Sequence, residues 1–159
     1  MPTEEMEITA ERTPKGMPRR LTLRKGEKLR HRTLVDTLFS EGETMYDFPF
    51  RLSYRLISRE ELENSFRTAP PTPIDSLQML ITVPKKKRRR AIDRVLMRRR
   101  IREAYRLNRL PLLDAVAALP GNCTLCMAFI YIHDKNADYS LIERKMKALL
   151  KKLADKLIK

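Results

Sequence analysis

One segment of nearly uniform positive charge constrains this chain more than any other feature of its sequence. Residues 85–109 hold thirteen basic side chains and only two acidic ones, Asp93 and Glu103, so they carry +11 of the chain's net charge of +14. A one-sign surface this dense destabilises a folded protein by self-repulsion unless a polyanion lies opposite it. Nucleic acid is the partner that such a distribution favours.

The spacing within this segment predicts an amphipathic helix over residues 91–108. At about 100° per residue, one half of the helix is apolar and is expected to pack on a sheet. That half comprises Ile92, Leu96, Met97, Ile101, Ala104 and Leu107. The opposite arc is a stripe of arginines, namely Arg94, Arg98, Arg99, Arg102, Arg106 and Arg109.

The arginine stripe favours binding of RNA or DNA. The planar guanidinium group donates two parallel hydrogen bonds to a phosphate and stays charged. The alternative is a solvated charged face, but such faces usually mix signs for pairing along the helix. Val95 is an apolar exception inside the arc, and Arg100 points toward the apolar half, where its stem can reach back to solvent. Glu103, one turn after Arg99, is expected to orient that arginine.

The rest of the chain predicts a single α/β sandwich. Residues 1–20 are polar and contain three prolines, which indicates a disordered tail, and residues 21–159 are expected to form one domain. Helices are predicted within residues 24–39 (with Gly42 as the C-terminal cap), 112–119 and 140–157, the last opened by a capping box of Ser140 and Glu143. Strands are predicted at 48–56, 77–83 and 123–132. Residues 59–76, with prolines at 70, 71 and 73, are expected to form a loop.

The remaining polar residues do not suggest a protein active site. Cys123 and Cys126 form a lone C-x-x-C within a predicted strand, so buried inert thiols are favoured over a zinc site or a redox pair. His31 and His133 lack acid–base partners nearby in the sequence and are expected to be structural. No apolar run approaches the roughly 20 residues of a membrane span. The N-terminus lacks a signal-peptide core, so we expect a cytoplasmic protein without a membrane partner.

The basic segment also carries an ordered motif. The stretch Arg94-Val-Leu-Met-Arg98-Arg99-Arg-Ile-Arg102-Glu103 resembles the Arg-Asn-x-x-Lys-Arg-x-x-Arg-Glu motif of the bacterial ribonuclease P protein component. The similarity extends over roughly residues 21–158 and includes Thr82-Val-Pro-Lys-Lys, Ala104-Tyr-Arg-Leu, Leu23-Arg-Lys-Gly and Leu38-Phe39-Ser-Glu-Gly42. Two positions depart from the motif. Val95 replaces its asparagine, and Arg98 replaces its lysine.

The resemblance implies a protein subunit of ribonuclease P. Such a subunit binds the catalytic RNA and the 5′ leader of precursor tRNA and so promotes maturation of the tRNA 5′ end. Catalysis then belongs to the RNA, with Mg²⁺ bound by the RNA and not by a protein site. The expected partners are ribonuclease P RNA and precursor tRNA, with no DNA and no membrane. The implied fold is a ribosomal-protein-like, four-stranded α/β sandwich of order α-β-β-β-α-β-α with a left-handed β-α-β crossover.

The resemblance also assigns roles to single residues. Arg94, Arg98, Arg99 and Arg102 would grip the catalytic RNA near the cleavage site, with Arg106, Lys86 and Lys87 on the same RNA-binding surface. Phe39 and Tyr54 would line a cleft between the first helix and the sheet, where bases of the leader stack. The main alternative is a ribosomal or other structured-RNA-binding protein of the same fold without a role in cleavage. A basic DNA-binding module ranks third, because no helix-turn-helix, zipper or finger is recognisable.

Overall fold

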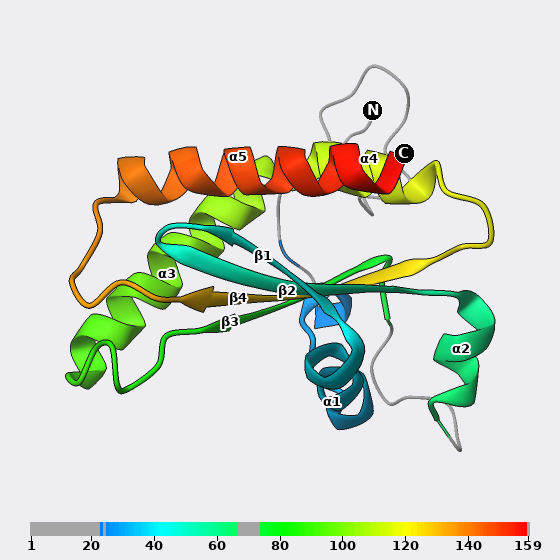
Figure 1. Cartoon of the computed structure of the whole chain (residues 1–159), viewed down its shortest axis with the longest axis horizontal. Helices are drawn as coiled ribbons and strands as arrows, with labels where there is room; N and C mark the ends of the chain where they lie inside the picture. The colour runs from blue at the N-terminus through cyan, green and yellow to red at the C-terminus, as the bar shows by residue number, and fades with distance from the viewer. Residues whose placement is uncertain (1–22, 24, 67–73, 159) are drawn as a thin grey trace, which may run out of the picture.

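A mixed four-stranded sheet lies between two unequal layers of helices (Figure 1). The computed structural model describes Leu23, residues 25–66 and residues 74–158. The strands are β1 (Glu43–Asp47), β2 (Phe50–Ile57), β3 (Leu77–Thr82) and β4 (Thr124–Tyr131), in the spatial order β1-β2-β4-β3. β1 and β2, and β2 and β4, pair antiparallel, whereas β3 and β4 pair parallel.

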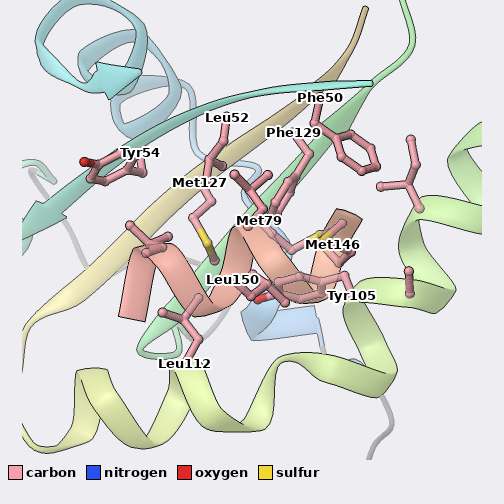
Figure 2. Close-up of a cluster of buried hydrophobic side chains, with 14 of the residues drawn as sticks. Phe50, Leu52, Tyr54, Met79, Tyr105, Leu112, Met127, Phe129, Met146 and Leu150 are labelled. Atoms are coloured by element: carbon pink, nitrogen blue, oxygen red, sulfur yellow. The ribbon is translucent and has the colours of Figure 1, made fainter. Parts of the chain in front are cut away.

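Three helices cover one face of the sheet. They are α3 (Ala91–Asn108), α4 (Leu110–Ala117) and α5 (Tyr139–Ile158). Because side chains alternate along a strand, every second residue of β2 and β4 points into this layer. These residues form the main core with the buried side of α5 (Figure 2): Phe50, Leu52, Tyr54, Leu125, Met127, Phe129, Tyr131, Ile142, Met146, Leu149, Leu150 and Leu153.

The opposite face carries shorter helices, chiefly α1 (Arg32–Glu41) (Figure 1). Leu34 and Leu38 of α1 pack with Ile57, Cys126 and Ala128 from the sheet in a second, smaller cluster. Gly42 ends α1 as the sequence predicts, and its N–H donates to the carbonyl of Leu38. A Cβ atom at Gly42 would lie 2.3 Å from that carbonyl oxygen, so no larger residue fits without a shift.

Each predicted helix and strand is present, with changes at several boundaries. β1, which the residue pattern did not indicate, supplies the fourth strand that the resemblance implies. The predicted loop 59–76 contains a helix, α2 (Arg59–Asn64), because Ser58 caps it by accepting a hydrogen bond from the Glu61 N–H. β2 begins at Phe50, and Phe48 lies in the turn that precedes it. The predicted capping box is wrong, since α5 already begins at Tyr139.

The remaining predictions concern the N-terminal residues, the loop prolines, the β-α-β crossover and membrane spans. Residues 1–20, expected to be a disordered tail, and prolines 70, 71 and 73 lie outside the described residues. A short 3-10 helix, η2 (Lys25–Glu27), precedes α1. The parallel connection from β3 through α3 and α4 to β4 matches the expected β-α-β crossover, whose left-handedness stays a prediction. Among the described helices, none is long and apolar enough to cross a membrane.

One of the two cysteines is buried as predicted, the other is not, and each of the two histidines packs against an aromatic ring. Cys126 is buried in β4, and burial raises the pKa of its thiol to about 12, so it is inert at neutral pH. Cys123 precedes the strand and is only half-buried, so the prediction of a buried thiol is wrong there. The ring of His31 packs edge-on against Phe66 at 5.0 Å. His133 lies beside Phe48.

Candidate RNA-binding surface

The buried face of α3 is turned relative to the one that its apolar residues predict. Met97, Ile101, Ala104 and Tyr105 are buried, whereas Ile92 is 66% exposed and Leu107 is 38% exposed. The predicted core positions Ile92 and Leu107 are therefore wrong. Tyr105 belongs to the buried face instead, and its ring centroid lies 5.6 Å from that of Phe129.

The outer face of α3 presents arginines interspersed with apolar side chains. Arg99 and Arg102 are exposed, and Arg98 is partly exposed. None of the three forms an ion pair with the described residues, so their guanidinium groups are available to a phosphate. Val95 is 44% exposed on the same surface, as the sequence predicts.

Arg94 contributes positive charge to this surface and also holds the adjacent loop in place by hydrogen bonds. It begins the basic motif, and its Nη1 donates to the carbonyl oxygens of Arg88 at 3.0 Å and Arg89 at 2.7 Å. These bonds fasten the basic loop of residues 84–90, which joins β3 to α3, onto the first turn of the helix. Arg88 adds an ion pair of 3.0 Å with Asp93. The loop is thereby fixed before any ligand arrives.

Glu103 pairs with Arg106 and not with Arg99. The two side chains form a bidentate contact, with Nε–Oε1 at 3.0 Å and Nη2–Oε2 at 2.6 Å. The hydrogen bond lowers the pKa of the Glu103 carboxyl and raises the pKa of Arg106. The predicted orientation of Arg99 by Glu103 is therefore wrong, because a contact three residues onward is equally accessible on a helix. Arg106 stays on the surface but with part of its charge compensated.

Arg109 does not belong to the exposed stripe. It is 2% exposed, and its Nε donates to the Glu27 carboxylate at 2.6 Å. The prediction that placed it on the arginine arc is wrong, because α3 ends at Asn108 and the chain turns there into α4. This buried ion pair connects η2 to the corner between α3 and α4. Arg100 is half-buried, and its Nη1 donates to the carbonyl of the core residue Ala137 at 2.5 Å, so its charged end is bonded within the protein.

A basic hollow lies at the start of α3. It encloses about 530 Å³ and is lined by Lys86, Lys87, Arg88, Arg89, Arg90, Asp93 and Asp134. Lys86 and Lys87, both predicted to bind RNA, therefore lie in this hollow, beside the first turn of α3. Among the described residues, no group of three His, Cys, Asp or Glu side chains could hold a metal ion.

The structure does not bring Phe39 and Tyr54 together in one cleft. Phe39 is 49% exposed on α1, whereas Tyr54 is 4% exposed and belongs to the core beneath α5, on the other face of the sheet. The Tyr54 hydroxyl donates to Glu43 at 3.2 Å, and Lys156 lies over its ring. The prediction of Tyr54 as a stacking residue is therefore wrong. Its position in the strand explains why, because Phe50, Leu52 and Tyr54 share the core face.

The sheet face that α1 covers carries polar residues of β2, which the sequence reasoning missed. Arg51, Ser53 and Arg55 alternate with the core residues and point to the α1 side. Arg55 is bound to Glu61 and Glu41. Arg51 is half-buried, and its Nε has no partner among the described residues. The alternating pattern of residues 50–56 indicated these positions, because the polar residues of a strand face the side opposite to its apolar residues, which include Tyr54.

Fold and surface together define a class of protein. An α/β sandwich that presents a preformed basic loop and exposed arginines along one helix is suited to binding structured RNA through its phosphates. Comparison with known proteins narrows this class to one family. Residues 23–154 match the family model for Ribonuclease P, and the chain belongs to that family.

Individual relatives agree with this assignment. The chain is 34% identical over 132 residues to a ribonuclease P protein component of Porphyromonas gingivalis, covering 83% of this chain and 86% of that protein. Its fold is similar to that of the RNase P protein of Staphylococcus aureus, with a TM-score of 0.57, 17% identity and coverage of 81% and 96%. The RNase P protein of Thermotoga maritima gives a TM-score of 0.55 at 21% identity, with coverage of 79% and 96%.

Proposed function

We propose that this chain is the protein subunit of a ribonuclease P holoenzyme and supports removal of the 5′ leader from precursor tRNA. The observation that carries the proposal is the outer face of α3, where Arg98, Arg99 and Arg102 have no ion-pair partner among the described residues. Unpaired guanidinium groups on a rigid helix suit the phosphates of a folded RNA. The catalytic RNA of ribonuclease P is the partner proposed for this surface.

The proposal assigns the chemistry to the RNA subunit. The protein contributes positive charge and position, and Mg²⁺ held by the RNA supplies the metal chemistry of phosphodiester hydrolysis. A basic subunit favours this assembly, because neutralising RNA phosphates lowers the repulsion between catalytic RNA and substrate RNA. The expected setting is the cytoplasm, where precursor tRNA would be bound.

The leader would lie on the α1 side of the sheet. Phe39 supplies an exposed aromatic ring there, and Arg51 supplies the positive charge of a half-buried guanidinium group whose buried Nε has no partner among the described residues. A ring for bases and a cation for the backbone together suit a single strand of variable sequence. With Tyr54 facing the other way, this cleft relies on Phe39 and on Arg51.

Reconstitution tests the proposal. The purified chain is mixed with its cognate ribonuclease P RNA and a precursor tRNA at low Mg²⁺, and 5′-end cleavage is measured on a gel. We expect cleavage to depend on the chain, and we expect the variant Arg99→Ala/Arg102→Ala to lose most of the stimulation. The matched control is Arg32→Ala, which removes one exposed charge from α1.

Two outcomes would contradict the proposal. One is failure to stimulate cleavage under conditions in which an authentic ribonuclease P protein succeeds with its own RNA. The other is tight binding of ribosomal RNA fragments with no effect on cleavage, which would favour the alternative of a ribosomal or other structured-RNA-binding protein. In both cases circular dichroism of the chain would show whether it was folded.

A further inference from the structure

An exposed aromatic pair lies at the turn between β1 and β2. Phe48 is 54% exposed, and its ring centroid lies 4.9 Å from that of His133. His133 in turn lies 6.2 Å from the buried ring of Tyr131. The Phe48 ring is therefore supported from within the protein and still open to solvent. The outer face of the Phe48 ring is therefore accessible to a ligand that can stack on it.

The aromatic pair adjoins the basic hollow at the start of α3. His133 lies next to Asp134, which lines the hollow, and its Nδ1 is 3.4 Å from the Asp134 carboxylate. On the other side, Arg88 Nη1 donates to the Asp134 carbonyl at 2.6 Å. His133 and Asp134 therefore connect the exposed aromatic pair to the basic hollow.

Of the two acidic residues that line the hollow, Asp93 is engaged by the protein, whereas the Asp134 side chain is exposed. Asp93 accepts a hydrogen bond from Asn136 at 3.1 Å and pairs with Arg88 at 3.0 Å. The bond from Asn136 and the nearby arginines lower the pKa of the Asp93 carboxyl. The other basic side chains that line the hollow form no ion pair with the described residues: Lys86, Lys87, Arg89 and Arg90. The hollow therefore presents an excess of positive charge, which favours a phosphate.

We propose that Phe48 and the basic hollow together bind one unpaired nucleotide of an RNA strand. Its base stacks on the Phe48–His133 pair, and its phosphate enters the hollow. Stacking requires an unpaired base, because a base inside a duplex has no free face. A ligand with phosphate alone would leave the aromatic pair unused. The inference rests on the proposed RNA-binding function, but it concerns a site separate from the outer face of α3 and from the α1 side of the sheet.

Nuclear magnetic resonance of the full chain tests this site directly. The sequence contains two histidines, so few imidazole ring-proton signals have to be assigned. We titrate the protein with a single-stranded hexaadenylate RNA and, separately, with tripolyphosphate. The RNA is expected to shift the ring signals of Phe48 and His133, whereas a shift of His31, the N-cap residue of α1, would report binding on the α1 side of the sheet. Tripolyphosphate is expected to shift the backbone amides of residues 86–90 without the ring-current shifts that a stacked base produces.

Variants separate stacking from charge. Phe48→Ala is expected to weaken hexaadenylate binding about 5- to 100-fold, the range for removal of one stacked base, and to leave tripolyphosphate binding unchanged. Phe48→Tyr keeps a ring and should keep the affinity. Tyr46→Ala removes another exposed aromatic from the same hairpin and should have no effect. Arg89→Ala/Arg90→Ala should weaken binding of both ligands.

The results distinguish failure of this inference from failure of the proposed function. If RNA shifts the signals of α3 but leaves those of Phe48 and His133 unaffected, the nucleotide site is overturned and the RNA-binding surface stands. An unchanged hexaadenylate affinity in Phe48→Ala has the same meaning. If hexaadenylate shifts neither site while the reconstituted holoenzyme still cleaves precursor tRNA, the inference is overturned and the proposed function stands. Failure of both experiments contradicts both.

Discussion

At the scale of single residues, the arginines of α3 differ in what they contact. Arg94 is bound to loop carbonyls, Arg106 to Glu103 and Arg109 to Glu27, so part of the hydrogen-bonding capacity of each is used inside the protein. Arg99 and Arg102 are exposed and have no ion-pair partner among the described residues. Their removal should therefore affect RNA binding far more than folding.

The first prediction concerns these two arginines. Arg99→Ala/Arg102→Ala should reduce the dependence of RNA affinity on salt by about one unit of slope for each phosphate that is no longer neutralised. The free energy of unfolding should change by less than about 0.5 kcal/mol per substitution, because neither side chain is buried. Filter binding over a salt series and urea denaturation measure the two effects. Arg32→Ala is the control, and an unchanged slope in the double variant would exclude α3 as the RNA-binding surface.

At the scale of elements, ion pairs connect segments that are distant in sequence. Glu27 and Arg109 join η2 to the α3–α4 corner, with side chains 7% and 3% exposed. On the other side of the molecule, Asp47 of β1 pairs with Lys145 at 3.3 Å and with Lys152 at 3.5 Å, both from α5. The edge strand β1 is thus held beside the long helix by charges as well as by the sheet.

The second prediction concerns the buried pair. Arg109→Ala should lower the free energy of unfolding by about 3–5 kcal/mol, because it leaves the Glu27 carboxylate buried without its principal partner. Arg106→Ala, which removes the exposed pair with Glu103, should cost less than about 1 kcal/mol. Urea denaturation compares the two variants. Equal decreases would show that the Glu27–Arg109 ion pair does not stabilise the fold.

The third prediction concerns pH and the contact between β1 and α5. Hydrogen bonds from Lys156 and Tyr54 lower the pKa of the Glu43 carboxyl. A lowered pKa in the folded state stabilises the protein above the ordinary glutamate value of about 4.3, and this contribution disappears as the pH falls below it. The stability difference between the wild type and Glu43→Gln should therefore be largest near neutral pH.

Thermal unfolding between pH 7 and pH 3 measures this difference. The effect is expected to be small and to shrink at high salt, because the Glu43 side chain is 68% exposed. A difference between the two proteins that grows as the pH falls would contradict the assignment.

At the scale of the whole molecule, the net charge of +14 determines how the free protein behaves. Thirteen of its basic residues lie in one segment, and the structure places the exposed ones on the outer face of α3 and around the adjoining hollow. Repulsion among these groups destabilises the folded state when no anion is present. The RNA partner would remove this repulsion on assembly.

The fourth prediction follows from this repulsion. Phosphate should raise the midpoint of thermal unfolding more than chloride does at equal ionic strength, because a multivalent anion binds the folded basic surface and stabilises it by mass action. The effect should be reduced in Arg89→Ala/Arg90→Ala, which removes two charges from the hollow. Differential scanning calorimetry measures both midpoints. Identical midpoints in the two salts would contradict a preformed anion-binding surface.

The sequence by itself determined the order of the main helices and strands, the basic helix and the family, because hydrophobic periodicity and charge spacing are local properties of the chain. The sequence also showed the alternation of apolar and polar residues along β2. Only the tertiary structure decided which side of each element is buried. In α3, Tyr105 is buried and Ile92 is exposed, and in β2, Tyr54 packs into the core beneath α5.

Pairings between distant residues also required the tertiary structure. Glu27 and Arg109 are far apart in the sequence, and so are Phe48 and His133. No local pattern indicates which charge meets which, or which ring lies beside a basic loop. Burial against a partner layer depends on how all elements pack together, and that packing determined which arginines of the basic segment stay available to RNA.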